Sequence, residues 1–172
     1  MEPTKPSAQW LTAFDDFMKI VEHLRSLEGC PWDLEQTHES LKRNLIEESY
    51  EVLEAIDSQD PRKLSEELGD ILLQVALHAD IAKKAGHFAI EDVLAQINQK
   101  LVRRHPHVFG NTIVTGVREV EDNWERLKEA ERGSSSPVAG IPQETPSLAY
   151  AQLMQDRVAK AGFDWEDISG VL

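Results

Sequence analysis

The sequence predicts an all-α protein, because apolar residues recur at helical spacing along most of the chain and strand signals are almost absent. Several segments before residue 131 place apolar side chains three and four positions apart, which is the spacing of one helix face. Only residues 112–115 are rich in β-branched side chains, and between two glycines they fit a loop as well as a strand. We therefore expect a helical bundle of about five helices.

Prolines and glycines separate the predicted helices. Gly29 and Pro31 interrupt the chain after the first helix, and Pro61 is well placed in the first turn of the third. The fourth helix must stop before Pro106, since an interior proline removes a helical hydrogen bond. The predicted helices cover about residues 10–24, 39–57, 61–84, 90–105 and 117–131.

The composition after residue 132 predicts a change of organisation. Residues 133–147 are small, polar and rich in proline, as in a flexible linker. Residues 148–161 could form one more helix, and the chain then stops without a closing pattern. We expect a domain at 1–132, a linker at 133–147, and a connector at 148–172 that leads toward a second domain.

The formal net charge of −13 disfavours a nucleic-acid polymer as the main partner, since phosphate contacts require a basic surface. A small phosphorylated ligand stays possible, because a few cations or a metal ion can hold it. No apolar run reaches the roughly 20 residues of a membrane span, and the first ten residues lack a signal-peptide pattern. The single cysteine, Cys30, fits a reducing cytoplasm.

Two acidic blocks on consecutive predicted helices share one spacing. Residues 47–51 read Glu-Glu-Ser-Tyr-Glu and residues 66–70 read Glu-Glu-Leu-Gly-Asp. Acids three positions apart lie about 60° apart around a helix. Glu48 and Glu51 therefore project together, and so do Glu67 and Asp70.

The position of Glu48 turns this spacing into a metal-site hypothesis. On a helical wheel Glu48 falls inside the apolar stripe of its helix, Glu51 and Glu67 flank their stripes, and Asp70 lies further out. A buried carboxylate needs a cationic partner, and neither stripe contains lysine or arginine. Carboxylates without cysteine or histidine suit Mg²⁺, or Mn²⁺ as a substitute. The alternative is a solvated acidic face, since 31 of 172 residues are acidic.

Other polar residues allow two interpretations each. Lys100, Arg103 and Arg104 share a helix face and could clamp phosphate, although cations are also favoured near any helix C-terminus. Asn44 lies one turn before Glu48 and could steer a carboxylate, contact a ligand or cap a helix. Trp124 could stack on a base or pack in the core. Gln74 and His78 continue the polar edge beyond Asp70, where a hydrogen-bonded core histidine is the default.

Four motifs follow one another along the chain: GCPWD at 29–33, EESYE at 47–51, EELGD at 66–70 and RRHPHVFG at 103–110. Together they resemble the MazG family of nucleoside-triphosphate pyrophosphohydrolases. The resemblance implies an all-α core completed by homodimerisation, in many members as one of two tandem domains. It implies Mg²⁺ ligands at Glu48, Glu51, Glu67 and Asp70, with Glu47 as the first acid of the motif. It also implies a nucleotide contact at Asn44, Lys100, Arg103, Arg104 and Trp124.

The reaction implied by the resemblance converts a nucleoside triphosphate and water into a monophosphate and pyrophosphate. Glu47 is the candidate general base that activates the water. Two rival hypotheses remain. A regulatory module would keep the fold for dimerisation or nucleotide binding without turnover. A di-iron bundle would need two Glu-x-x-His motifs, and the sequence has only Glu35-x-x-His38.

Overall fold

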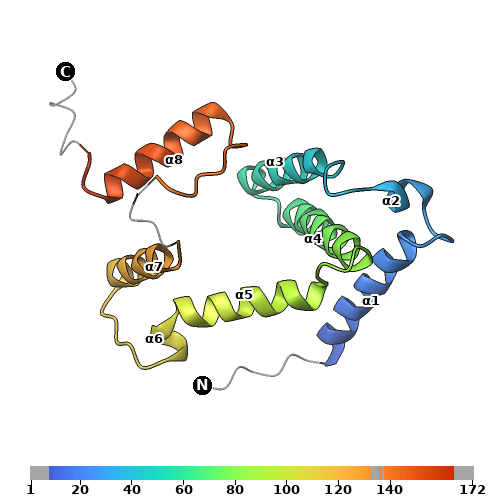
Figure 1. Cartoon of the computed structure of the whole chain (residues 1–172), viewed down its shortest axis with the longest axis horizontal. Helices are drawn as coiled ribbons and strands as arrows, with labels where there is room; N and C mark the ends of the chain where they lie inside the picture. Colours follow the sequence, from blue (N-terminus) through green and yellow to red (C-terminus); the bar gives the residue numbers. More distant parts are fainter. Residues whose placement is uncertain (1–7, 133–135, 137, 165–172) are drawn as a thin grey trace. The chain divides into compact units, whose positions relative to one another are not determined.

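The structure is a computed structural model that describes residues 8–132, 136 and 138–164. Every regular element in those ranges is a helix, so the all-α prediction is confirmed (Figure 1). None of the described helices has the length and apolar character that a membrane crossing requires. The helices are α1 (Ala8–Leu24), α2 (Pro31–Glu35), α3 (Lys42–Ser58), α4 (Pro61–Lys84), α5 (Ile90–Arg104), α6 (Pro106–Phe109), α7 (Val117–Arg132) and α8 (Ser147–Lys160).

Two short helices, α2 and α6, were not expected from the apolar pattern. Each begins with a proline, Pro31 and Pro106, whose fixed φ suits a first helical turn. With five and four residues, they are too short for a periodic signal to emerge. Residues 112–115 form neither helix nor strand, as their flanking glycines allowed.

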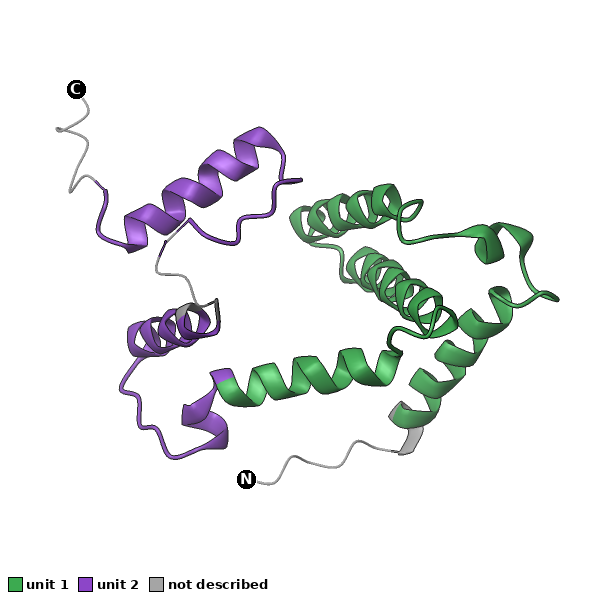
Figure 2. Cartoon of the chain, in the orientation of Figure 1, with its two compact units in different colours: residues 1–103 green, residues 104–172 purple. Residues whose placement is uncertain are grey.

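The chain divides into two compact units, Met1–Arg103 and Arg104–Leu172 (Figure 2). The predicted linker at 133–147 falls in the second unit, and several of its first residues lie outside the described ranges. The predicted domain at 1–132 and connector at 148–172 therefore stay predictions.

The centre of the first unit is an antiparallel pair of helices, α3 and α4, with α1 packed on α4 (Figure 1). A two-residue connection joins α3 to α4. Gln59 ends α3 in the left-handed conformation, with φ of 55°. Asp60 then caps α4, because its carboxylate accepts hydrogen bonds from the backbone N–H groups of Arg62 and Lys63. The tight turn fixes which residues of α3 face which residues of α4.

The apolar core of this unit is small. Val21 of α1, Leu41 just before α3, and Ala76 and Leu77 of α4 are almost fully buried and pack together. Phe17, Met18, Leu73 and Ile81 cover this cluster.

A buried ion pair ties α1, α2 and α4 together beside the core. Arg25 and Asp80 are each 4% exposed, and the Arg25 Nε donates a 2.8 Å hydrogen bond to Asp80. The same guanidinium donates to the backbone carbonyls of Asp33 and Gln36 around α2. Lys84, one turn after Asp80, places its Nζ 2.8 Å from the same carboxylate oxygen. The bonds around Arg25 thereby hold the 25–36 segment, which contains α2, against α4.

Part of the apolar stripe expected to face the core along α4 is exposed in the single chain. Leu68 and Val75 of that stripe keep 51% and 38% of their surface accessible, and Leu72 beside them keeps 42%. The other members of the stripe, Leu64, Ile71 and Ala82, are half-buried or buried. The buried face of α4 instead includes Glu67 and Gln74. A helical wheel identifies residues that share a face of a helix. It does not show which face the rest of the same chain covers.

The second unit is organised around Trp124 of α7. The Arg104 guanidinium lies 5.2 Å from the centre of the Trp124 ring, and the His105 ring meets the same indole edge-on at 5.0 Å. Arg104 also forms an ion pair with Glu131, at 2.5 Å between Nη2 and Oε2. Further along, the Arg157 side chain of α8 donates to the backbone carbonyl of Ala139. These bonds link the segments within this unit.

Candidate metal centre

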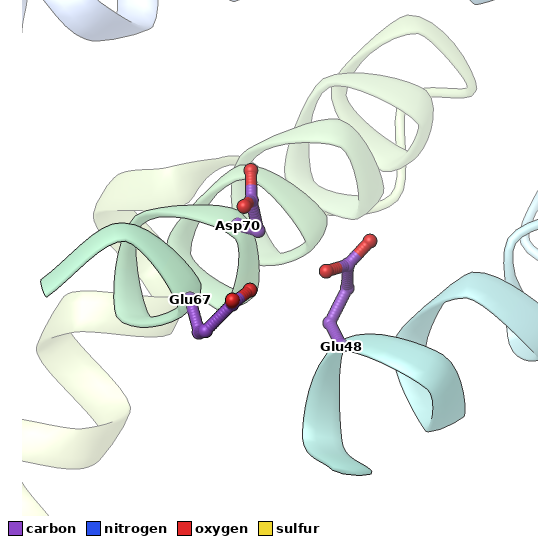
Figure 3. A group of neighbouring side chains, drawn as sticks. All are labelled: Glu48, Glu67 and Asp70. Carbon is purple, nitrogen blue, oxygen red and sulfur yellow. The ribbon is translucent and has the colours of Figure 1, made fainter. Parts of the chain in front are cut away.

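Three carboxylates meet between α3 and α4. Glu48 of α3 faces Glu67 and Asp70 of α4 (Figure 3), and one oxygen from each lies within 4.8 Å of the others. The short α3–α4 connection brings them together, because antiparallel helices place residues before the turn opposite residues after it. The structure therefore assembles one acid of the first motif and two of the second.

The burial of these acids differs from the expectation. Glu67 is the most buried, at 8% exposed, whereas Glu48 and Asp70 are half-buried. The sequence had placed Glu48 innermost and Glu67 on the flank. The order changes because the face of α4 that contains Glu67, and not the Leu68 stripe, turns toward α3.

The cluster is electrostatically unfavourable without a cation. Burial raises the pKa of the Glu48 carboxyl, and the charges of Asp70, Glu51 and Glu67 raise it further. Burial also raises the pKa of Glu67, followed by the nearby Glu51 carboxylate. Lys63 lowers the pKa of Glu67, but less than these causes raise it. The carboxylates therefore repel one another, and the site favours a positive charge.

The donor set fits a hard divalent cation. An octahedral Mg²⁺ ion with bonds of about 2.1 Å places its ligands about 3 to 4.2 Å apart, which is compatible with oxygens that lie within 4.8 Å of one another. All three donors are carboxylate oxygens, the type that Mg²⁺ and Mn²⁺ prefer. A set of three protein ligands also suits Mg²⁺, because the remaining coordination positions can hold water and substrate phosphates. Glu48, Glu67 and Asp70 could therefore hold this ion.

The other two acids of the first motif, Glu47 and Glu51, lie at the edge of the cluster. Glu51 is exposed but close enough to Glu67 to raise its pKa. Glu47 is exposed and has the smallest effect among the acids that raise the pKa of Glu48. Both line an open groove along α3, together with Arg43 and Tyr50. Their predicted roles, ligand for Glu51 and base for Glu47, stay predictions.

The predicted nucleotide contacts divide between the two units. Asn44 is half-buried on α3, one turn before Glu48, while Lys100 and Arg103 are exposed on α5. Arg104 and Trp124 belong to the second unit, where they contact each other. Asn44 is therefore one helical turn from a candidate ligand in its own helix, and the contacts of all five residues with a nucleotide stay predictions.

Sequence reasoning missed a second polar contact between α4 and the segment before α3. The Nδ1 atoms of His38 and His78 lie 2.8 Å apart, and the rings stack with centres 5.1 Å apart. Burial lowers the pKa of His78, and the neighbouring His38 lowers it further. His78 is a hydrogen-bonded histidine, as its position suggested. Its partner could not be read from the sequence, since 40 positions separate the two residues.

Comparisons with known proteins show the family of this chain. Residues 36–109, which include all three clustered acids, match the family described as MazG nucleotide pyrophosphohydrolase domain. The "Nucleoside triphosphate pyrophosphohydrolase/pyrophosphatase MazG" of Thermotoga maritima is 48% identical over 160 residues, which cover 92% of this chain and 61% of that protein. The "Nucleoside triphosphate pyrophosphohydrolase" of Escherichia coli K12 is 41% identical over 166 residues, covering 94% of this chain and 63% of that one.

A solved structure extends the likeness to the fold. The crystal structure of a mazG-related protein from Thermotoga maritima is 30% identical, with a TM-score of 0.56, and the match covers 67% of this chain and 98% of that one. The chain spans less than two thirds of the length of the two curated relatives, and its predicted place as the first of two tandem domains stays a prediction. On the family match, the identity to these relatives and the near-complete coverage of the solved structure, the chain belongs to the MazG family.

Proposed function

We propose that this protein is a Mg²⁺-dependent nucleoside-triphosphate pyrophosphohydrolase, which converts a nucleoside triphosphate and water into a nucleoside monophosphate and pyrophosphate. The observation that carries the proposal is the cluster of Glu48, Glu67 and Asp70 between α3 and α4. The names of the curated relatives support this reaction. We place the enzyme in the cytoplasm, where the free Cys30 stays reduced.

Each side chain of the site would have a distinct role in the reaction. Glu48, Glu67 and Asp70 would hold the ion, with Glu51 joining them from the edge of the cluster. When bound, Mg²⁺ supplies positive charge that binds and polarises the triphosphate. Glu47, which is exposed beside the cluster, would accept the proton of the water that attacks the α-phosphorus. Pyrophosphate then leaves, and the carboxylates form no covalent bond to the substrate.

The remaining predicted residues would bind the nucleotide. Asn44 adjoins the cluster and can hydrogen-bond a substrate oxygen or orient Glu48. Lys100 and Arg103 offer exposed cations for phosphate. Arg104 and Trp124 form a stacked cation–aromatic pair that could contact the base.

We further propose that two copies of the chain form a homodimer. Apolar side chains are left exposed on several helices of the first unit, including Leu53 of α3, Leu68 and Leu72 of α4, and Ile97 of α5. Exposed apolar surface that recurs at helical spacing is typical of an interface. Sedimentation of the purified protein should give twice the mass of one chain, and a monomer at the assay concentration would contradict the dimer.

The test is a product assay with each of the common nucleoside triphosphates and Mg²⁺. Pyrophosphate should appear together with the monophosphate, and removing Mg²⁺ with EDTA should stop the reaction. Glu67→Gln should lower turnover at least about 100-fold, because even groups outside the ligand set typically cost 10- to 100-fold at metal sites. Glu66→Gln is the matched control, since Glu66 is exposed next to Glu67, and its turnover should stay close to wild type.

Three outcomes would contradict the proposal. Orthophosphate as the first product would exclude attack at the α-phosphorus. Equal turnover by Glu67→Gln and wild type would exclude the proposed metal site. Nucleotide binding without turnover of any triphosphate would favour the rival hypothesis of a catalytically inactive regulatory module.

A further inference from the structure

The histidine pair His38 and His78 makes a short polar contact beside the apolar core. The Nδ1 atoms are 2.8 Å apart, whereas the ring centres are 5.1 Å apart, so the nitrogen atoms at the edges of the half-buried rings make the contact. His38 lies three positions before the core residue Leu41, and His78 directly follows the core residue Leu77. The pair therefore joins the same two segments that the core joins, the segment before α3 and helix α4.

The hydrogen bond between these nitrogen atoms depends on how many protons the two rings hold. A neutral imidazole has one N–H group and one bare nitrogen, so one ring must have its proton on Nδ1 and the other on Nε2. A first added proton binds Nε2 of the donor ring and leaves the bond intact. A second added proton must bind the Nδ1 atom that accepts the bond. It breaks the bond, because two N–H groups cannot donate to each other and two positively charged rings repel.

The surroundings of the pair favour the neutral rings. Burial lowers the pKa of His78 from its ordinary value of 6.5, and the charge of His38 lowers it further. The titratable and charged groups on the elements around the pair are the ion pairs Arg25–Asp80, Lys84–Asp80, Glu22–Lys83 and Glu39–Lys42, and the side chains of His23, Asp33, Glu35 and Arg43. None of these groups is among the causes that shift the pKa of His78.

We propose that the His38–His78 pair is a pH-sensitive switch, which holds the segment before α3 on α4 while one proton lies between the two Nδ1 atoms, and releases that segment when both rings are fully protonated. The switch is independent of the metal centre, because His78 lies about two helical turns beyond Asp70 and His38 lies outside α3. Histidine suits this role, since its charge changes close to physiological pH.

The sign of the pH effect follows from the pKa of His78. The pKa is lower in the folded protein than in the unfolded chain, so the unfolded chain binds more protons as the pH falls. The contribution of His78 to stability is therefore fully present above the ordinary value of 6.5, and it is lost as the pH falls through the folded-state pKa.

The first test compares the urea midpoints of wild type and His38→Asn at pH 8 and pH 5, in EDTA so that no metal ion bridges the nitrogen atoms. The asparagine amide offers both a donor and an acceptor and does not titrate, so it can bind either form of His78. The midpoint of wild type should fall between pH 8 and pH 5, and that of His38→Asn should fall less. His78→Asn removes the other titrating ring and should behave in the same way.

His87→Asn is the matched control for loss of a histidine. His87 is exposed between α4 and α5, so this variant should show the pH dependence of wild type. If the midpoints of His38→Asn and His78→Asn fall as much as that of wild type, the switch is excluded.

The second test follows the protons and the segment directly. NMR of protein labelled with ¹⁵N-histidine at pH 8 should show that the two Nδ1 atoms of the pair together carry one proton. The amide N–H of Leu41, which donates to the carbonyl of Thr37, should exchange faster in wild type than in His38→Asn at pH 5, and equally fast at pH 8. Two unprotonated Nδ1 atoms at pH 8 would overturn the shared proton. Equal exchange of Leu41 in both proteins at pH 5 would overturn the release of the segment.

Discussion

Helix α4 contains two buried acids, Glu67 and Asp80, in opposite electrostatic surroundings. Asp80 is 4% exposed and lies within 2.8 Å of nitrogen atoms of both Arg25 and Lys84. Glu67 is 8% exposed, and its main charged neighbour is the Glu51 carboxylate, which raises its pKa. One acid is thus neutralised by the chain, and the other is surrounded by more negative charge.

The difference separates a structural site from a ligand site. A buried carboxylate needs a cation, and the chain supplies that cation where the purpose is to join α1, α2 and α4. Beside α3 the chain supplies further carboxylates instead, which raises the free energy of the empty protein. A site that destabilises its own fold is best explained by something that binds to it.

The largest effect is expected when the ion pair between Arg25 and Asp80 is broken. Arg25→Met should lower the free energy of unfolding by about 3 kcal/mol, because it leaves Asp80 buried with only Lys84 to compensate it. Urea denaturation in EDTA measures this loss. Combining it with Asp80→Leu should restore much of the stability, since no unpaired buried charge remains and Lys84 is partly exposed to solvent.

Lys84→Ala is the control for that variant. The Lys84 side chain is 42% exposed, so solvent screens its pair with Asp80 and the loss should be about 0.5 kcal/mol. Equal losses for Arg25→Met and Lys84→Ala would mean that the guanidinium has no special role in neutralising Asp80.

A smaller effect of opposite sign is expected at the carboxylate cluster. The pKa of Glu48 is higher in the folded protein than in the unfolded chain. Its contribution to stability is therefore fully present below the unfolded-state pKa, and it is lost as the pH rises through the folded-state pKa. At pH 7 in EDTA, Glu48→Gln should therefore raise the free energy of unfolding, by less than about 1 kcal/mol at this half-buried site. The gain should shrink as the pH falls toward 4.5. Urea denaturation at several pH values measures it.

The control is Glu54→Gln on the same helix. The hydrogen bond from Lys63 lowers the pKa of Glu54, so removing that charge should slightly destabilise the protein at pH 7. Saturating Mg²⁺ should stabilise wild type more than Glu48→Gln, because the ion binds the folded cluster. A Glu48→Gln protein that is less stable than wild type in EDTA would contradict the repulsion between these acids.

Local patterns in the sequence predicted most of the fold and the centre of the site. The helical class and the meeting of Glu48, Glu67 and Asp70 follow from apolar spacing, prolines and matched acidic motifs. The helical class and the carboxylate cluster depend on residues within one or two helical turns of each other or on consecutive helices. Over such short separations, helical geometry allows few alternative arrangements.

Contacts between distant segments could not be predicted. Arg25 and Asp80 are 55 positions apart, and nothing in their local sequence pairs them. The exposure of Leu68 and Leu72 was also hidden, because a helical wheel does not show whether the same chain covers an apolar face. The order of burial between Glu48 and Glu67 was wrong for the same reason.

The tight turn at Gln59 and Asp60 has a consequence for folding kinetics. Glu48 and Asp70 are separated by only 22 positions, so the cluster closes a short loop with little entropic cost. Contacts of such low sequence separation form early, whereas the Arg25–Asp80 pair must wait for distant segments to meet. We expect the α3–α4 hairpin to form first, and the acids that would bind the ion to be assembled before the rest of the unit has folded around them.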